Sequence, residues 1–477
     1  MADVVVVGGG VVGLCGGLLL ARDGHRVRLL ERDPAPPPSS PDDAWTGWER
    51  RGVNQFRMLH SFLPRFREIL EAELPDVAGA IGDAGALRTN VIGSLPAQIT
   101  GGTRPGDERF TALTGRRPVV EAAISRLAGR EPGLEIRRGA AVRGLVTGIE
   151  PRLPGIPRVV GVVTDAGEEL RADLVVDVSG RRSPLPEWLR VIGARPPEEE
   201  REDSGFVYYG RHFRSQDGSV PPAFGPPLQP YDSVSIVLLP ADNGTWGVGL
   251  VTSARDTVLR AARHVDVWER IVKSYPLAAH WLEGEVISDG VEVMAKLEDR
   301  HRRLWSACAP VATGLIALGD AWACTNPSVG RGASIGLLHA LCLRNLLRAV
   351  PASDRVELVR RWDEVTREVV EPWYRDTVAF DRHRLAEIEA QIAGVPYETD
   401  DPAWLLGEAL RRNAASDPDL LRAMVTIRSL LDRSADVLAR PGLAEKVMSL
   451  DPPEPPPGPS RDELVGLVGR ESVVGAS

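Results

Sequence analysis

Cysteine is scarce in this chain of 477 residues, and its histidines are not spaced as metal ligands. The eight histidines include no H-E-x-x-H pattern. The four cysteines are too few and too scattered for a disulfide framework or a zinc site. They are Cys15, Cys308, Cys324 and Cys342. These absences favour a protein of the reducing cytoplasm that holds no metal.

Lysine is equally rare, and basic residues as a whole are outnumbered by acidic ones. Lys273, Lys296 and Lys446 are the only lysines, so chemistry that needs an amine side chain has three places to happen. The formal net charge is −9 at pH 7. A chain with this balance lacks the basic footprint that nucleic acid or an anionic membrane attracts. We therefore expect no nucleic-acid partner.

One long apolar run, residues 4–21, lies near the start of the chain. Three features disfavour a signal peptide or a membrane span: Asp3 precedes the run, no basic segment precedes it, and glycines at positions 8–10 interrupt it. The proportions of hydrophobic residues (43%) and charged residues (26%) are those of an ordinary globular protein. The run is interpreted as a buried strand, a glycine turn and a buried helix, with no membrane span.

The first thirty residues have the pattern of a βαβ unit: a β-branched strand over 3–7, a helix over 11–23 and a second strand over 26–30. The letters GGGVVG at positions 8–13 fit G-x-G-x-x-G between strand and helix. In this motif Gly8 permits the tight turn, Gly10 lets the backbone approach a pyrophosphate, and Gly13 lets helix and strand pack closely. The N–H groups and dipole at the helix N-terminus then favour that anion.

Glu31 stands at the end of the second strand, 18 residues past Gly13. A carboxylate there can accept hydrogen bonds from both ribose hydroxyls of an adenosine. It would repel a 2′-phosphate, which excludes NADP and leaves NAD or FAD. We expect Glu31 and its neighbour Arg32 to contact the nucleotide.

A second glycine motif resolves that choice. Gly319-Asp320-Ala321 follows a predicted strand, and Pro327, Gly330 and Gly332 come after it. The spacing resembles the fingerprint G-D-x(6)-P-x-x-G-x-G of the p-hydroxybenzoate hydroxylase-like FAD-dependent monooxygenases. The resemblance covers about residues 3–348 and implies FAD. Asp320 would accept a ribityl hydroxyl, and Pro327, Gly330 and Gly332 would bring a helix N-terminus to the pyrimidine edge of the flavin. A helix N-cap is the alternative role of Asp320.

A third stretch, DLVVDVSGRRS at residues 173–183, resembles the D-G motif of the same family, with Ser179 where the usual hydroxylase has aspartate. In those hydroxylases the motif is linked to both FAD and NAD(P)H. In having a serine at this position, the chain is similar to halogenases, geranylgeranyl reductases and squalene or polyether epoxidase-like members of the family. The resemblance therefore implies either NAD(P)H or a separate flavin reductase as the electron source.

Two smaller likenesses lie between the fingerprints. Residues 51–55 (RGVNQ) and His60 resemble a segment that borders the flavin in the epoxidase-like branch. Arg117 resembles the arginine that approaches the FAD phosphates. A loop and a solvated surface arginine are the alternative interpretations.

The remaining patterns predict further elements. Helices are expected over residues 57–74, ending at Pro75, and over 119–127, 334–347 and much of 354–440. Strands are expected near 134–136, 159–164, 174–178 and 314–318, with an antiparallel sheet over 206–253. Residues 34–43 predict an irregular loop.

Together these features predict an α/β fold: a Rossmann-like FAD-binding domain with an inserted antiparallel-sheet substrate domain and a helical C-terminal region. The expected parts are 1–200 and 301–350 for FAD binding, 201–300 for the substrate sheet, 351–450 for the helical region, and 451–477 for a proline-rich tail ordered only in part.

The resemblance implies a monooxygenase that hydroxylates or epoxidises a bulky apolar small molecule, an activity expected in secondary metabolism. Reduced FAD would react with O₂ to give a C4a-hydroperoxide, so no catalytic side chain is indicated. The expected substrate-lining residues, for which strand packing is the alternative, are Tyr208, Tyr209, His212 and Trp246.

Three functions other than a monooxygenase are considered on the same motifs. A halogenase is disfavoured because the family's early lysine is missing. A geranylgeranyl-reductase-like enzyme and a flavin-binding protein without turnover stay open as alternatives. Asp381 and His383 are interpreted as structural.

Overall fold

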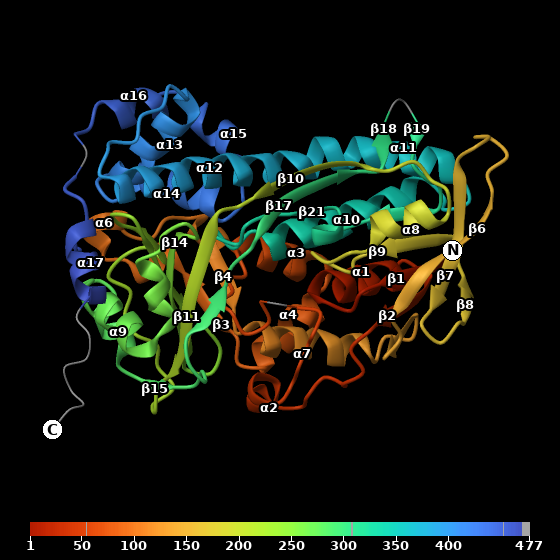
Figure 1. The fold of residues 1–477 in the computed structure, drawn as a ribbon, viewed down its shortest axis with the longest axis horizontal. Helices are drawn as coiled ribbons and strands as arrows, with labels where there is room; N and C mark the ends of the chain where they lie inside the picture. The colour runs from red at the N-terminus through yellow and green to blue at the C-terminus, as the bar shows by residue number, and fades with distance from the viewer. Residues whose placement is uncertain (54, 307–308, 452, 470–477) are drawn as a thin grey trace.

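The chain begins with a βαβ unit at the centre of a parallel sheet (Figure 1). The computed structural model describes residues 1–53, 55–306, 309–451 and 453–469. Asn54, in the segment expected to border the flavin, and Cys308 lie outside these residues. The elements of the unit are β1 (Asp3–Val7), α1 (Val11–Arg22) and β2 (Arg26–Glu31). Each matches its predicted range to within one residue.

Strands from distant parts of the chain complete this five-stranded sheet, whose order is β20-β9-β1-β2-β5. The added strands are β5 (Leu134–Arg138), β9 (Leu174–Asp177) and β20 (Leu315–Ala317). All neighbouring pairs are parallel, and Asp177 is in register with both Val7 and Ala317. The loops after β1, β9 and β20 therefore leave the same edge, where parallel sheets bind ligands.

A second, antiparallel sheet follows and confirms the prediction for residues 206–253. Its strands are β11 (Phe206–Arg214), β12 (Leu228–Pro230), β13 (Ser235–Pro240), β14 (Thr245–Ser253), β15 (Glu285–Val286) and β16 (Glu292–Met294). Helix α9 (Val265–Lys273) packs on one face, where Phe213 stacks between Trp246 and Trp268 at centroid distances of 6.1 and 6.3 Å.

Helices make up most of the chain after residue 331 (Figure 1). They are α10 (Gly332–Ala349), α11 (Arg355–Val365), α12 (Glu371–Ala393), α13 (Pro402–Asn413), α14 (Pro418–Arg428), α15 (Ser434–Leu438), α16 (Leu443–Met448) and α17 (Arg461–Gly469). A π-helical turn, Thr366–Val370, joins α11 to α12. Helices α12 to α16, blue in Figure 1, lie above the green antiparallel sheet. No helix in the described part of the chain is long and apolar enough to cross a bilayer.

The other elements are shorter and lie between these layers. The helices are α2 (Pro41–Thr46), α3 (Pro64–Glu73), α4 (Pro75–Asp83), α5 (Val91–Ser94), α6 (Ala97–Thr100), α7 (Arg117–Ala128) and α8 (Leu185–Val191). The strands are β3 (Leu87–Asn90), β4 (Thr111–Thr114), β6 (Val142–Ile149), β7 (Pro157–Thr164), β8 (Glu169–Arg171), β10 (Glu198–Asp203), β17 (Glu298–Arg303), β18 (Trp305–Ser306), β19 (Ala309–Pro310) and β21 (Ala323–Cys324).

The structure corrects two predictions about element boundaries and adds a helix that starts at Pro75. Residues 57–63 are not helical, and the predicted helix begins only at Pro64. Pro75 starts a new helix as well as ending the first, because proline is well suited to the first helical position. The expected loop over 34–43 is shortened by α2, whose N-cap Ser40 accepts a hydrogen bond from the Asp43 N–H at 3.1 Å.

Candidate cofactor and substrate site

The glycine turn after β1 leaves open space at the N-terminus of α1. Gly8 has φ +114°, and a Cβ there would lie 2.5 Å from the Val178 carbonyl oxygen. A Cβ at Gly13 would overlap the Gly8 carbonyl oxygen, whereas one at Gly10 would have no atom within 4 Å. No side chain caps α1, and the first N–H groups of a helix have no intrahelical acceptor. This geometry fits an anion lying over Gly10.

The second fingerprint packs directly on the first. Gly319, with φ +52°, lies beside Val12 in the first turn of α1, and a Cβ at Gly336 of α10 would lie 2.5 Å from the same side chain. The Gly319 N–H donates to Nδ1 of the buried His339 at 3.4 Å. The structure thus brings Gly10 and Asp320, 310 positions apart in sequence, to one end of the parallel sheet.

Asp320 and the loop that follows it make few contacts with the rest of the described chain. The half-buried Asp320 carboxylate accepts no hydrogen bond within the described residues. Gly330 has φ +67°, donates to the Pro327 carbonyl at 2.9 Å, and lies close to Ser61. Gly332 is the first residue of α10, and a Cβ there would meet open space. All four predicted residues of this fingerprint therefore surround the start of α10.

Glu31 lies at the end of β2, as expected, but its carboxylate is already engaged. It accepts from the Gly9 N–H at 2.8 Å, from the Asp33 N–H at 2.8 Å and from Arg50 Nη2 at 2.6 Å. Arg50 is 5% exposed and also pairs with Asp33 at 3.1 Å and with Glu121. A carboxylate has about four acceptor positions. One position of Glu31 is left for a ribose hydroxyl unless Arg50 moves.

Arg117 joins this cluster from the first position of α7. Its Nε donates to Glu121 at 3.2 Å, and its Nη1 donates to Nε2 of His60 at 3.2 Å. Since Arg117 has only donors, His60 carries its proton on Nδ1 and donates to the Met58 carbonyl at 2.9 Å. Burial, and then the charge of Arg117, lower the pKa of His60 to about 3. His60 is therefore neutral at physiological pH.

Arg32 and Ser179 each lie against other parts of the chain. Arg32 is exposed, and its guanidinium lies close to Gly52. Ser179 donates its hydroxyl to Asp177 at 2.5 Å, next to Gly8. Burial raises the pKa of Asp177, which also accepts from the Ser183 hydroxyl. The serine variant of the D-G motif thus serves a buried hydrogen-bond network at the sheet edge.

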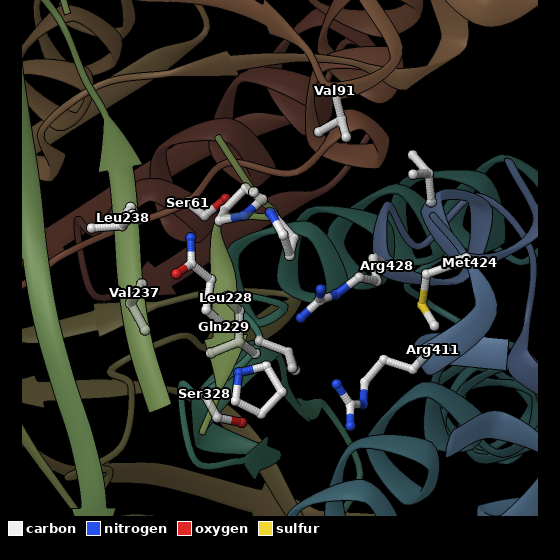
Figure 2. A pocket seen from close by; sticks show the side chains of 18 of the residues that line it. Ser61, Val91, Leu228, Gln229, Val237, Leu238, Ser328, Arg411, Met424 and Arg428 are labelled. Carbon is white, nitrogen blue, oxygen red and sulfur yellow. The ribbon is translucent and has the colours of Figure 1, made fainter. Parts of the chain in front are cut away.

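A cavity of about 1810 Å³ lies between the antiparallel sheet and the C-terminal helices (Figure 2). Tyr208, Tyr209 and the loop 327–331 line it. His212 and Trp246 do not, so the alternative of strand packing holds for these two residues. Trp246 donates to the Trp281 carbonyl at 2.7 Å.

A buried polar network lies between this cavity and α12. The hydroxyl of Tyr208 donates to Asn326 Oδ1 at 2.6 Å, and that of Ser328 donates to Asp381 at 2.5 Å. Asp381 is 2% exposed, its other carboxylate oxygen has no partner within the described residues, and burial raises its pKa to about 8. A strongly perturbed carboxyl group near a cavity is a candidate functional group, and structural networks also perturb pKa. Asp381 itself does not line the cavity, so its structural role stays a prediction.

No sequence pattern pointed to Arg50 or to the arginines of α13 and α14 that face the cavity, and Asp381 was predicted to be structural. Nothing local marks Arg50, because its partners lie up to 71 positions away. Asp381 did leave a signal, because it is in helical phase with the buried residues Thr377, Val378 and Ile388 of α12. No three His, Cys, Asp or Glu side chains in the described ranges are grouped as a metal site.

These features fit an FAD. Open space over Gly10, free N–H groups on α1 and an unpaired Asp320 carboxylate lie at one sheet edge, and the 327–332 loop extends from them to a large cavity. The specific contacts of each residue with the cofactor stay predictions.

Comparison with known proteins agrees with this geometry. Residues 3–81 match the protein family described as FAD dependent oxidoreductase. The chain is 26% identical over 395 residues to Protein Rv3254 of Mycobacterium tuberculosis, an overlap of 78% of this chain and 79% of that protein.

Solved structures of similar fold include a hydroxylase, a probable FAD-dependent monooxygenase and a Diels-Alderase. The anhydrotetracycline hydroxylase OxyS from Streptomyces rimosus has a TM-score of 0.56 and 19% identity, with 90% of this chain and 76% of that one covered. PqsL from Pseudomonas aeruginosa, a probable FAD-dependent monooxygenase, has a TM-score of 0.56, 15% identity and coverage of 81% and 99%. The Diels-Alderase PyrE3 has a TM-score of 0.56, 17% identity and coverage of 90% and 81%. At these identities the likeness is one of fold.

Proposed function

We propose that this protein, an FAD-dependent oxidoreductase, is a monooxygenase that hydroxylates or epoxidises a bulky, largely apolar small molecule. One observation carries the proposal: the 1810 Å³ cavity is bounded by residues 327–331, which include part of the second fingerprint. A substrate in the cavity would therefore adjoin the segment expected to hold the flavin. The epoxidase-like branch is supported by Ser179 and by the position of His60 beside Arg117.

The chain's own groups would hold the cofactor at one sheet edge. The N-terminus of α1 over Gly10 would bind the pyrophosphate, and Glu31 would bind the adenosine ribose. Asp320 would accept a ribityl hydroxyl, and Pro327, Gly330 and Gly332 would place the start of α10 beside the flavin. FAD, when bound and reduced, supplies the activation of O₂.

The cavity's tasks are to exclude water and to orient the substrate. We assign FAD binding to residues 1–200 and 301–350 and substrate binding to 201–300 together with the helical region 351–450. Electrons would come from NAD(P)H or from a separate flavin reductase. The scattered cysteines support a cytoplasmic location.

The test traces an oxygen atom from isotopically labelled O₂ into the product. The purified protein should be yellow with flavin that acid releases. It is then incubated under ¹⁸O₂ with a panel of polycyclic aromatic substrates, with electrons supplied as NADH, as NADPH or through an added flavin reductase. We expect mass spectrometry to find one ¹⁸O atom in each product molecule, and the productive electron source identifies the reductant.

Other products would refute oxygen transfer. A product that gains two hydrogens without oxygen, and forms equally well without O₂, would instead identify the geranylgeranyl-reductase-like alternative. Unchanged substrates throughout would favour a flavin-binding protein without turnover.

A further inference from the structure

Arg428, the last residue of α14, projects into the cavity described above. Figure 2 shows Arg428 and Arg411 of α13 directed inward from the helical side, facing Leu228 and Gln229 on the sheet side. Most of the wall between them is apolar and includes Val237. Two guanidinium groups therefore face this part of the cavity.

Arg428 has no counter-ion in the structure. Within the described residues its side chain forms neither an ion pair nor a hydrogen bond. Its nearby charged neighbours are themselves arginines, Arg411 and Arg331. These charges, after burial, lower the pKa of Arg428 to about 10, so it still carries its charge at neutral pH.

Two other arginines of the helical wall are paired, whereas Asp376 of α12, which also lines the cavity, forms no ion pair within the described residues. Arg411 donates its Nε to Glu408 at 2.7 Å, and Arg384 is paired with Glu387. Burying a cation without a partner is costly. Arg428 differs from Arg411 and Arg384 in having no carboxylate partner within the described residues.

The facing wall offers a second unpaired donor. Gln229 is 2% exposed, and its Oε1 accepts from the Tyr231 hydroxyl at 2.8 Å. Its Nε2 has no acceptor within the part of the chain that the structure describes. Two sides of one cavity therefore carry polar hydrogens that lack an acceptor, as expected where a ligand supplies the oxygens.

We infer that the cavity binds an apolar small molecule bearing an anionic oxygen group, of the carboxylate class, which pairs with Arg428. Arg411, already paired with Glu408, lies beside it, and the unpaired guanidinium of Arg428 can bind a carboxylate through two parallel hydrogen bonds. This inference rests on the proposed function, because the molecule is its substrate. Pairing at Arg428 would fix the orientation of the apolar framework relative to residues 327–330.

The test uses two probes that share a polycyclic framework and differ in the end group: pyrene-1-butyrate and pyrene-1-butanol. Both are titrated into the flavin-loaded protein and followed by pyrene fluorescence. We expect the wild type to bind the butyrate about tenfold more tightly than the alcohol, a difference that added salt reduces. Arg428→Met should abolish this preference and leave affinity for the alcohol within about twofold.

Three variants serve as controls. Arg190→Met removes an exposed arginine of α8 that pairs with Glu187, and it should change neither affinity. Leu228→Trp, which narrows the cavity, should weaken both probes. Arg428→Gln is measured alongside Arg428→Met, because a change in side-chain shape could disturb the wall.

Three outcomes overturn the inference. They are equal binding of the two probes by the wild type, a preference that survives in Arg428→Met, and loss of the alcohol in both Arg428 variants, which would show that Arg428 serves packing. Oxygen transfer is tested separately. If the wild type prefers the butyrate but its products contain no ¹⁸O, the anion-binding site is supported and the proposed monooxygenase activity is refuted.

Discussion

Arg50 is the side chain on which the buried charges near the glycine turn depend. It pairs with Glu31, Asp33 and Glu121, whose side chains are all at most 9% exposed. Its guanidinium also donates to the Gly9 carbonyl at 3.3 Å. Any nucleotide at Gly10 would therefore lie beside a cluster that this one cation holds together.

Arg50→Met should leave the buried carboxylates of Glu31 and Asp33 without their cation, and Glu121 paired with Arg117 alone. Breaking a buried ion pair from one side costs about 3–5 kcal/mol. We expect the free energy of unfolding in urea to fall by at least that much, together with the flavin content of the purified protein. Arg50→Lys is the matched control: it keeps the charge but not the fork geometry, so its loss should be smaller. Equal stability of Arg50→Met and wild type would contradict this account.

Asp381 makes the stability of the protein depend on pH. Burial raises its pKa from 3.8 to about 8. Between those values the folded protein holds a proton that the unfolded chain releases. The stability that this bound proton contributes is therefore complete below about pH 4. As the pH rises toward 8, the free energy of unfolding falls by about 1.4 kcal/mol per pH unit.

Asp381→Asn has no such proton and should lack this dependence. From pH 5 to pH 7 we expect the variant to gain about 3 kcal/mol relative to wild type, because only the wild type pays for keeping Asp381 protonated. Urea unfolding at pH 5, 6 and 7 measures the difference. Asp400→Asn, at an exposed position, should run parallel to wild type. If Asp381→Asn also ran parallel, Asp381 would titrate normally.

Helix α17 shows that the proline-rich tail returns to the body of the protein. Leu464 is fully buried in the core beneath the antiparallel sheet, among residues that include Trp268. Arg461 pairs with Asp256, whose side chain is 1% exposed, at 2.6 Å. The amphipathic pattern of this short helix is weak, so its docking depends on these two contacts more than on helix propensity.

Deleting residues 461–477 should therefore destabilise the sheet that the tail covers. The deletion exposes the site of Leu464 and leaves Asp256 without its arginine, and we expect a loss of about 2–4 kcal/mol. Thermal unfolding followed by tryptophan fluorescence measures it. Deleting only 470–477 leaves every described contact in place and should not change the midpoint. If both truncations behaved alike, α17 would contribute no stability.

Elements whose signal is local were predicted from the sequence, and those set by distant partners were not. The β-branched run of β1, the glycine turn and the strands of the antiparallel sheet each carry their own pattern, and the structure confirms them. Residues 57–63 have helical spacing but lie as a non-helical segment, where Leu59 occupies the space left by Gly210 and Gly247 of the sheet. No pattern within the segment encodes that contact. The same holds for Arg50 and Arg428, whose roles arise only when distant elements meet.

Hydrogen bonds of His339 connect the end of the parallel sheet to the C-terminal helices. His339 of α10 accepts from the Gly319 N–H with one ring nitrogen and faces the Thr366 hydroxyl with the other at 3.2 Å. Thr366 begins the π-helical turn between α11 and α12. Since π-helical turns are often found at functional sites, this link from the second fingerprint to α12 fits a fold built around one ligand.

FAD should therefore stabilise the protein as a whole, because its expected contacts belong to segments that are 310 positions apart, at Gly10 and Asp320. A ligand at one hundred times its dissociation constant adds about 2.7 kcal/mol to stability. We expect the thermal midpoint of protein stripped of flavin to rise by several degrees on adding FAD, and not on adding NADP.

Gly10→Val should lose both bound flavin and this rise, because its side chain would fill the space over α1. Gly144→Val also places a side chain in open space, but in β6, and should keep both. A yellow Gly10→Val protein with full occupancy would mean that the pyrophosphate lies elsewhere.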